Sequence, residues 1–223
     1  MKFRHELKHE ISYMDLLVVR QRLKLTMKKD LHATDGKYCI RSLYFDTPSD
    51  KALREKLDGV SRREKFRIRY YNGETSVIRL EKKSKFGGLG SKCSVMLSRD
   101  QAQNIIEGKT EWILDSKEPL LREFYSKAVA QRLEPKTIVE YTREPFVYPT
   151  GNVRVTLDYN IRTKIGCSDF WDQNCATIAA AGTPIIMEVK WDEFLPSFIR
   201  DAVQLESRRS SAFSKYAQCR VYG

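Results

Sequence analysis

The chain has 223 residues, with 40 Lys and Arg against 29 Asp and Glu, which gives a formal net charge of +11 at pH 7. Hydrophobic residues make up 41% and aromatic residues 11%, enough for a core, so a wholly disordered chain is excluded. No apolar run approaches the roughly 18 residues that span a bilayer, and the charged beginning of the sequence does not resemble a secretory signal. We therefore expect a cytoplasmic protein with a single domain over residues 1–223. The excess of cations indicates an anionic partner, which is nucleic acid, a membrane surface or a polyphosphate.

Cysteine and histidine restrict the possible chemistry. The five Cys are odd in number and form no CxxC motif, so we expect reduced thiols and no zinc site. The three His all lie within the first 32 residues, and no Ser stands in a GxSxG motif. A metal ion, if the protein uses one, is expected to be a hard cation held by carboxylates and phosphate oxygens.

Strand patterns dominate the chain, because apolar and charged residues alternate with a period of two in many segments. Two capping boxes, Ser12 with Asp15 and Ser98 with Gln101, mark the beginnings of helices. In chain order, the predicted elements are a strand over 2–11, a helix from Ser12 through Leu23, a strand over 37–47, a short helix over 49–58, strands over 64–71, 76–84 and 91–97, helices over 98–108 and 118–132, strands over 136–148, 152–163 and 184–192, and helices over 196–206 and 211–221.

The glycine-rich segment 85–90 is predicted to be a flexible connection between two strands. It lacks the following helix and the Lys-Ser/Thr pair of a P-loop, so we assign it no phosphate-binding role. The sequence contains no internal repeat and no linker that would divide it. The pattern is that of an α+β fold dominated by antiparallel strands.

Charged faces recur on many of these strands, for example at Lys65, Arg67 and Arg69, opposite faces that are strongly apolar. A single charged face is normally exposed to water. If amphipathic helices cover the apolar faces, however, the charged faces turn inward around a channel, and a barrel of about eight strands leaves room there for a small or linear ligand. A channel lined by Lys and Arg is reasonable if a polyanion occupies it. We therefore predict an antiparallel β-barrel tunnel with helices packed on the outside.

A set of short motifs occurs in one order on the predicted strands and near the end of the chain. The motifs are Arg4-His-Glu6-Leu-Lys8, Ile40-Arg-Ser-Leu-Tyr-Phe-Asp46, Lys65-Phe-Arg67-Ile-Arg69-Tyr70, Leu80-Glu81-Lys82-Lys83, Glu140-Tyr141-Thr-Arg143, Val153-Arg154-Val-Thr-Leu-Asp158, Met187-Glu188-Val-Lys190 and Phe213-Ser-Lys215-Tyr216. Their order resembles the VTC domain, the polyphosphate polymerase domain of the CYTH-like or triphosphate tunnel superfamily. The resemblance extends from Phe3 to about Tyr216.

The resemblance implies an enzyme that transfers the γ-phosphate of ATP to a growing polyphosphate chain, with Mn²⁺ or Mg²⁺ as cofactor. ATP and polyphosphate are then the partners, no specific nucleic acid is expected, and a membrane partner remains an open possibility. Matched position by position, the basic residues that grip phosphates are Lys8, Arg67, Arg69, Lys83, Arg143 and Lys215. The residues that share their inward parity and extend the basic lining are Lys65, Arg154 and Lys190. The predicted metal ligand is Glu188, and Glu6 and Glu81 are either further ligands or partners of neighbouring cations.

Two other functions remain open on the sequence: a hydrolase of triphosphates or nucleoside triphosphates, and a non-catalytic module that binds polyphosphate or single-stranded nucleic acid. Hydrolytic tunnel enzymes usually begin with Glu-x-Glu-x-Lys, whereas this chain has Lys8 between Glu6 and Glu10. A cation in place of a metal-binding carboxylate favours the polymerase. For the nucleic-acid alternative, Tyr70, Tyr71 and Tyr141 are candidates for base stacking. Because the sequence has neither a sensing domain nor membrane segments, we expect a stand-alone, bacterial-type member.

Overall fold

The computed structural model describes residues 4–31, 33, 35–87, 89–166, 170–205, 210 and 212–221. Within them, a single antiparallel sheet contains all the strands. Two short strands lie off its main path: β2 (Lys28–Lys29) pairs with β7, and β9 (Ile178–Ala179) pairs with β8. The main path runs through eight strands, in the order β1 (His5–Ile11), β10 (Ile185–Trp191), β8 (Val153–Ile165), β7 (Glu134–Tyr148), β3 (Tyr38–Asp46), β4 (Arg63–Tyr71), β5 (Glu74–Phe86) and β6 (Leu89–Leu97).

Both predicted capping boxes are confirmed at the helices that follow β1 and β6. The Ser12 hydroxyl accepts from the Asp15 backbone N–H at 3.1 Å, and the Ser98 hydroxyl accepts from the Gln101 N–H at 3.1 Å. The helices of the described residues are α1 (Tyr13–Thr26), α2 (Lys51–Leu57), α3 (Arg99–Ile106), α4 (Pro119–Gln131), α5 (Ser197–Val203) and α6 (Lys215–Val221), with short 3₁₀ turns η1 (Glu111–Asp115) and η2 (Thr150–Asn152).

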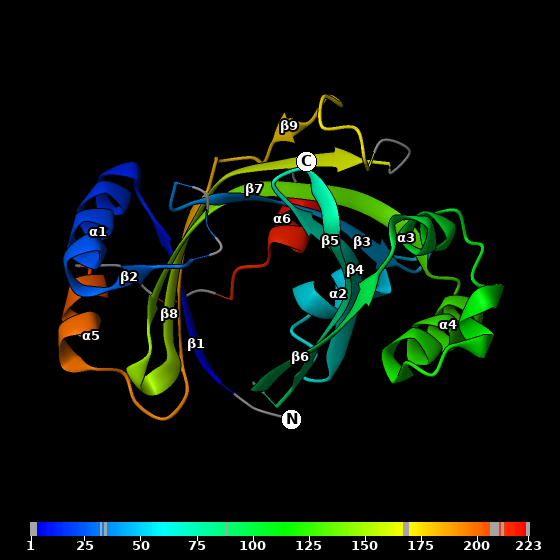
Figure 1. Cartoon of the computed structure of the whole chain (residues 1–223), viewed down its shortest axis with the longest axis horizontal. Helices are drawn as coiled ribbons and strands as arrows, with labels where there is room; N and C mark the ends of the chain where they lie inside the picture. Colours follow the sequence, from blue (N-terminus) through cyan, green and yellow to red (C-terminus); the bar gives the residue numbers. More distant parts are fainter. Residues whose placement is uncertain are drawn as a thin grey trace.

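The sheet curls into a half-barrel, as Figure 1 shows. We call β1, β10 and β8 the first wall and β4, β5 and β6 the second wall; β7 and β3 form the arch between them. In the part of the chain that the structure describes, no pairing joins the edge strands β1 and β6, so a seam without hydrogen bonds separates the two walls. The predicted fold class is confirmed: an antiparallel, tunnel-like sheet of eight principal strands with helices around it.

Irregularities in strand pairing bend the strands of the arch and the strands beside it. The register shifts at Tyr44/Phe45 between β3 and β7, at Glu140/Thr142 between β7 and β8, and at Arg69/Tyr71 between β4 and β5. A bulge of this kind kinks a strand and increases its local twist. The curvature of the sheet is therefore concentrated on the side of the molecule opposite the seam.

A tight turn sets the alignment of β4 with β5. Asn72 and Gly73 both have positive φ, 52° and 73°, as a two-residue hairpin turn with a right-handed twist requires. The Asn72 side chain also accepts the backbone N–H of Cys39 at 2.9 Å, which ties the turn to β3. Together with the adjacent bulge, this turn aligns Lys65 of β4 with Lys83 of β5.

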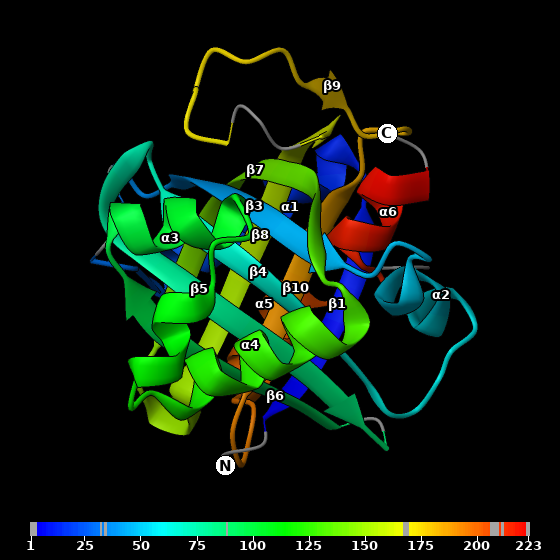
Figure 2. The ribbon, with the colours of Figure 1, turned by 90° about the vertical axis from the view of Figure 1, so that its right-hand side faces the viewer.

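Each wall has its own hydrophobic core on its outer side. Helices α3 and α4 cover the second wall, where Phe66, Ile68 and Leu80 pack against Phe124 and neighbouring residues (Figure 2). Helices α1 and α5 belong to the core of the first wall. Outward apolar faces and inward polar faces follow directly from the period-two alternation of the strands.

The last helix differs from the prediction that helices pack on the outside. Helix α6 lies within the curl of the sheet (Figure 1), where Tyr216 and Cys219 join inward-facing residues such as Ile40 and Tyr44 in a third core. The Tyr216 hydroxyl donates to Asp46 at 2.6 Å, which fixes the helix to the end of β3. This position brings the N-terminal residue of α6, Lys215, to the concave face.

All eight predicted strands are present, with ends that differ by a few residues. The largest difference is in the segment 85–90, where β5 continues to Phe86 and β6 begins at Leu89, so the connection is shorter than predicted. Residues 2 and 3 of the first predicted strand, and residues 206 and 211 of the last two predicted helices, lie outside the described residues. Among the described helices, none combines the length and the apolar character needed to cross a bilayer.

Candidate functional site

Charged side chains from both walls, from β7 and from α6 meet on the concave side of the sheet. Ion pairs and hydrogen bonds that cross from strand to strand join most of them. We call this group the tunnel cluster and define it as Glu6, Lys8, Lys65, Arg67, Arg69, Glu81, Lys83, Arg143, Asp158, Glu188, Lys190 and Lys215.

The first wall carries a ring of two lysines and two carboxylates. Lys8 lies opposite Glu188 in the pairing of β1 with β10, and Glu6 lies opposite Lys190. Lys8 Nζ is 3.4 Å from a carboxylate oxygen of each glutamate, and Lys190 Nζ is 3.1 Å from Glu6 and 3.4 Å from Glu188. Burial alone would raise the pKa of Glu188, but the surrounding cations, Lys190 foremost, hold that pKa well below its usual value. Glu188 is therefore ionised at neutral pH.

A second group links β7, β8 and α6 through a buried carboxylate. Asp158 is fully buried and accepts two hydrogen bonds from Arg143, from Nε at 2.6 Å and from Nη2 at 2.7 Å. Lys215 Nζ lies 2.6 Å from its second oxygen. Burial opposes ionisation of Asp158, but these two cations outweigh it and lower the pKa of the carboxyl. Asp158 ends one of the motifs quoted above, but no role is predicted for it from the sequence.

The second wall holds a buried arginine–glutamate pair. Arg67 donates to Glu81 through Nε at 2.7 Å and also through Nη2, and its Nη1 donates to the Tyr44 hydroxyl at 2.7 Å. The other Glu81 oxygen accepts from Lys92 at 3.0 Å. Arg67 and Glu81 are only 5% and 1% exposed, so water does not screen the pair. Although burial acts to raise the pKa of Glu81, Arg67, Arg69 and Lys92 hold it far below the usual value.

Tyr141 of β7 collects cations around its ring. The ring centroid is 4.7 Å from Lys215 Nζ, and the guanidinium carbons of Arg143 and Arg69 lie at 5.4 and 5.8 Å. Arg69 also donates to the Tyr141 hydroxyl at 3.1 Å and to the Ser42 hydroxyl at 2.9 Å. The negative electrostatic potential of an aromatic face attracts cations that lie over it. Tyr141 thus holds side chains from β4, β7 and α6 in one place.

Three lysines lie side by side across the second wall. Lys65, Lys83 and Lys92 are directly paired on β4, β5 and β6. Within the described residues, no carboxylate lies within ion-pair distance of Lys65 or Lys83; Lys65 Nζ instead contacts the Ser214 hydroxyl at 3.2 Å. Like charges directly opposite one another destabilise a sheet. A bound anion that lies against this row would offset the repulsion between the lysines.

The electrostatics of these lysines agree with that interpretation. Arg67 is the main cause of a pKa of Lys83 well below the usual lysine value, followed by burial and by Lys190 and Lys8. Burial, with the charges of Arg67 and Lys8 among others, lowers the pKa of Lys65 to about 8. Both shifts mean that positive charge is costly here while no anion is bound.

Among the predicted cations, Arg154 stands apart from the cluster. It is adjacent to Lys190 in the strand pairing, but its Nη2 donates to Asp30 at 2.9 Å and to the Tyr38 hydroxyl at 2.7 Å. Its side chain is 35% exposed. The other eight predicted cations belong to the tunnel cluster, and they outnumber its carboxylates.

Two of the three predicted metal ligands lie together. Glu6 and Glu188 share the same two lysines, whereas Glu81 lies on the opposite wall with its oxygens occupied by Arg67 and Lys92. Within the described residues, no group of three or more His, Cys, Asp or Glu side chains is arranged to hold a metal ion. Two carboxylates suit a hard divalent cation only if phosphate oxygens complete its ligands. Glu81 is therefore a partner of neighbouring cations, the second of the two roles that the sequence left open for it.

Other side chains cover Tyr70 and Tyr141, two of the three candidates for base stacking, and also His5. Tyr70 is 1% exposed and stacks on Trp171 on the outer side of the sheet, and cations cover Tyr141. His5 stacks on Trp191, on the face of β1 opposite Lys8. His32 lies outside the described residues. These positions remove much of the support for a nucleic-acid platform.

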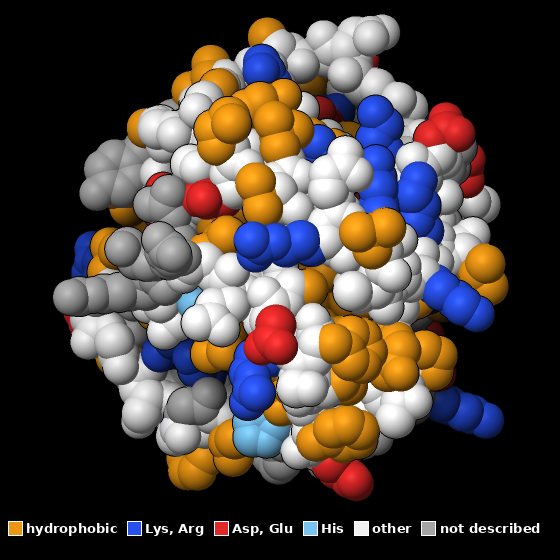
Figure 3. All heavy atoms as spheres, turned by 90° about the vertical axis from the view of Figure 1, so that its left-hand side faces the viewer, with side chains coloured by type: hydrophobic (Ala, Val, Ile, Leu, Met, Phe, Trp, Pro, Cys, Tyr) orange, Lys and Arg blue, Asp and Glu red, His pale blue; other side chains and the backbone are white. Residues whose placement is uncertain are grey.

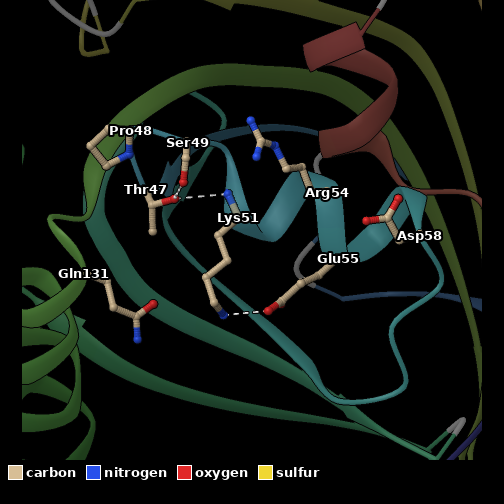
Figure 4. A pocket seen from close by; sticks show the side chains of 8 residues that line it. All are labelled: Thr47, Pro48, Ser49, Lys51, Arg54, Glu55, Asp58 and Gln131. Atoms are coloured by element: carbon tan, nitrogen blue, oxygen red, sulfur yellow. Dashed lines mark hydrogen bonds and ion pairs between the residues drawn. The ribbon is translucent and has the colours of Figure 1, made fainter.

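A cavity of about 520 Å³ lies away from the cluster, between α2 and the end of α4 (Figure 4). Its charges are balanced, since Lys51 pairs with Glu55 at 2.6 Å and Arg54 is accompanied by Asp58. The lining residues are Thr47, Pro48, Ser49, Lys51, Arg54, Glu55, Asp58 and Gln131. It contains no predicted site residue, and we assign it no function.

The half-barrel is the fold of the triphosphate tunnel proteins. The model of the VTC domain matches residues 3–222, so the chain belongs to the VTC domain family, and the resemblance predicted from the motifs is confirmed. A proposed adenylyl cyclase from Hippeastrum, described as having a dominant triphosphatase activity, is 16% identical, with a TM-score of 0.63 over 99% of this chain and 95% of its own. A proposed adenylate cyclase from Bacillus halodurans is 14% identical, with a TM-score of 0.53 over 85% and 80%. A search of curated proteins finds no match.

Proposed function

We propose that the protein is a polyphosphate polymerase that transfers the γ-phosphate of ATP to the end of a polyphosphate chain. The observation that carries this proposal is the excess of buried and half-buried cations on the concave face, including the half-buried Lys65 and Lys83, which have no carboxylate partner within the described residues. Buried positive charge without a partner is costly, and a row of phosphates supplies the missing partner. Membership of the VTC domain family supports the same substrate class.

Phosphoryl transfer depends mainly on positioning and on neutralisation of charge. In the proposed complex, Arg67, Arg69 and Lys83 bind phosphate oxygens from the second wall, Lys8 binds them from the first wall, and Arg143 binds them from the arch. Lys215 does so from α6. The terminal oxygen of the acceptor chain attacks the γ-phosphorus, the bond between that phosphorus and the β-bridging oxygen breaks, and ADP leaves.

A divalent metal ion, Mn²⁺ or Mg²⁺, is part of the proposal. Glu188 and Glu6 would hold it together with phosphate oxygens, and it would neutralise charge that develops on those oxygens. Glu81 is not included, because Arg67 and Lys92 already occupy its oxygens.

Two features favour a phosphate acceptor over water. Lys8 occupies the position where hydrolytic relatives usually have a carboxylate, and its contacts with Glu6 and Glu188 make it a cation of the first wall. A terminal phosphate is already an anion near neutral pH, so it needs no general base. Among the described residues, neither His5 nor His9 shares the strand face of Lys8 on β1.

The experiment is to incubate the purified protein with ATP and either Mn²⁺ or Mg²⁺, and to measure long-chain polyphosphate and ADP. Both products are expected to form together. A matched pair of variants tests the site: Lys83→Met removes a cation of the tunnel cluster, and Lys117→Met removes an exposed lysine that precedes α4. Loss of synthesis in the first alone supports the proposal. The absence of polymer with every metal tested would refute it.

Triphosphate hydrolysis is the second candidate, favoured by one observation: the Hippeastrum protein with the same fold is described as having a dominant triphosphatase activity. The same cations would bind the triphosphate, and water would replace the acceptor chain. Orthophosphate released from tripolyphosphate, without growth of polymer from ATP, would identify this activity.

A further inference from the structure

Helix α1 is apolar on two opposite sides. Leu16, Val19 and Leu23 are buried against the first wall at 0–1% exposure. A helix advances 100° per residue, so the line directly opposite this buried face passes through Met14, Val18, Gln21 and Leu25. The three apolar residues of that line are 67%, 43% and 88% exposed. A globular protein normally carries polar residues along the solvent side of a surface helix.

Positive charge flanks the exposed apolar line on both sides. Between Tyr13 and Lys29 the chain has five cations and a single acid. Asp15, the acid, is engaged in the N-terminal capping box. Arg20 forms two hydrogen bonds to Glu144 at 2.8 Å and so belongs to the buried side. The four exposed cations are Arg22, Lys24, Lys28 and Lys29.

The neighbouring helix also exposes an apolar side chain. Helix α5 packs beside α1, and Phe198 at its beginning is 41% exposed. Figure 3 shows the face that bears both helices, where clusters of apolar side chains are exposed with Lys and Arg between them. A large apolar patch on a protein surface generally marks a binding surface.

We propose that this face, formed by α1 with Lys28 and Lys29, binds peripherally to the surface of an anionic lipid bilayer. An exposed apolar line enters the boundary between headgroups and acyl chains, while flanking Lys and Arg contact anionic headgroups. The charges oppose a second copy as the occupant, because two copies of a chain with a net charge of +11 would bring like-charged helices together. The proposal depends neither on the tunnel cluster nor on its activity.

The test is flotation of the full chain with vesicles of phosphatidylcholine alone or phosphatidylcholine mixed with phosphatidylglycerol. Binding is expected only to the mixed vesicles and should weaken as salt is raised. Each cation near the surface contributes about fivefold to the partition coefficient, so Lys24→Gln with Lys28→Gln should reduce it roughly 30-fold. Removal of one large apolar side chain by Leu25→Ser should reduce it about tenfold or more.

Matched controls separate this surface from general effects of charge and hydrophobicity. Lys117→Gln removes an exposed cation elsewhere, and Val129→Ser removes an apolar side chain of α4 that is 61% exposed; neither should change binding. Lys83→Met should also bind vesicles normally, which excludes capture of headgroups by the tunnel cluster. Thermal unfolding of Leu25→Ser checks that this variant is folded.

Three results would overturn the proposal: no binding to mixed vesicles, equal binding to both kinds of vesicle, or binding that Leu25→Ser and the double lysine variant leave unchanged. Sedimentation of the protein without lipid measures its oligomeric state and provides a further test. A dimer that Leu25→Ser dissociates would assign this face to a second copy of the chain and contradict the lipid assignment.

Discussion

Replacing Asp158 by Asn removes the carboxylate that lies between Arg143 and Lys215. The substitution preserves the shape of the side chain but removes the anion that Lys215 pairs with, and it leaves Arg143 with only its longer contact to Glu188 at 3.5 Å. Asp158 is fully buried, and the side chains of Arg143 and Lys215 are 14% and 13% exposed, so water compensates for little of the loss. Breaking a buried ion pair by removing one partner costs about 3–5 kcal/mol of unfolding free energy.

For a chain of this size, 1 kcal/mol corresponds to about 2–4 °C in the midpoint of thermal unfolding. Asp158→Asn is therefore expected to lower the midpoint by about 6–20 °C. Glu107→Gln is the matched control, because its exposed pair with Lys109, at 2.6 Å, resembles the Asp158 pair in distance but not in burial. An exposed pair contributes about 0–1 kcal/mol, so the control should change the midpoint by a few degrees at most.

The informative measurement is thermal unfolding with and without tripolyphosphate. A ligand that binds only the folded chain raises the midpoint according to its concentration and affinity. In Asp158→Asn, the bound anion also replaces the missing carboxylate beside Arg143 and Lys215, so its stabilising effect should exceed that on the wild type. A variant as stable as the wild type, or an equal increment from tripolyphosphate in both proteins, would refute the reasoning.

Three further predictions concern single residues of the tunnel cluster. The pKa of Lys65 is lowered to about 8, so tripolyphosphate affinity should fall as the pH rises through 8. The unliganded fold should gain stability as the pH rises from 8 to the ordinary lysine pKa, because the unfolded chain then binds more protons at this position. Calorimetric titration of Lys65→Arg, which stays charged, should show a smaller fall in affinity, and the fall that remains is due to Lys83, whose pKa is also lowered. Lys83→Met should leave the unfolding midpoint unchanged or higher, since it removes repulsion from Arg67, while kcat/KM falls about 100- to 1,000-fold; a stable variant with normal kinetics would exclude a role in catalysis. Glu188→Gln should make the rate insensitive to Mn²⁺ while nucleotide binding partly survives, and an unaltered Mn²⁺ titration would remove Glu188 from the proposed metal site.

Much of the fold could be predicted because the strand signal is local. The alternation at Lys65, Arg67 and Arg69 determines which residues share a face, and in an antiparallel sheet that face is either exposed or enclosed. The motifs resolved this choice, since their order indicated a tunnel. The capping residues Ser12 and Ser98 were equally reliable, because a cap depends on residues only three positions apart.

The interior position of α6 could not be predicted from a local sequence signal. Helix α6 is held there by long-range contacts, such as Tyr216 with Asp46 and Arg220 with Asp50 at 2.8 Å. No periodicity within 211–221 distinguishes an inner surface from an outer one. The prediction of Lys215 as a site residue depended on the motif alone.

Partners within the site were harder to predict than the site residues themselves. Parity places Glu81 and Arg67 on one face but does not indicate that Glu81 bonds to Arg67 and Lys92, which follows from the register of three strands. Tyr141 presents the same difficulty, because an aromatic residue on a strand usually belongs to the core. Only the assembled sheet reveals the cations around its ring.

The seam between β1 and β6 has a consequence for how the protein accommodates its ligand. Because separate cores support the two walls, the spacing of the cationic surfaces depends on the flexure of β7 and β3, where the bulges lie. Hydrogen bonds across the seam, which would fix one diameter, are absent from the described strands. The width of the passage is thus an adjustable property of the arch, and insertions or deletions at the bulges should change it without altering any residue that is proposed to contact phosphate.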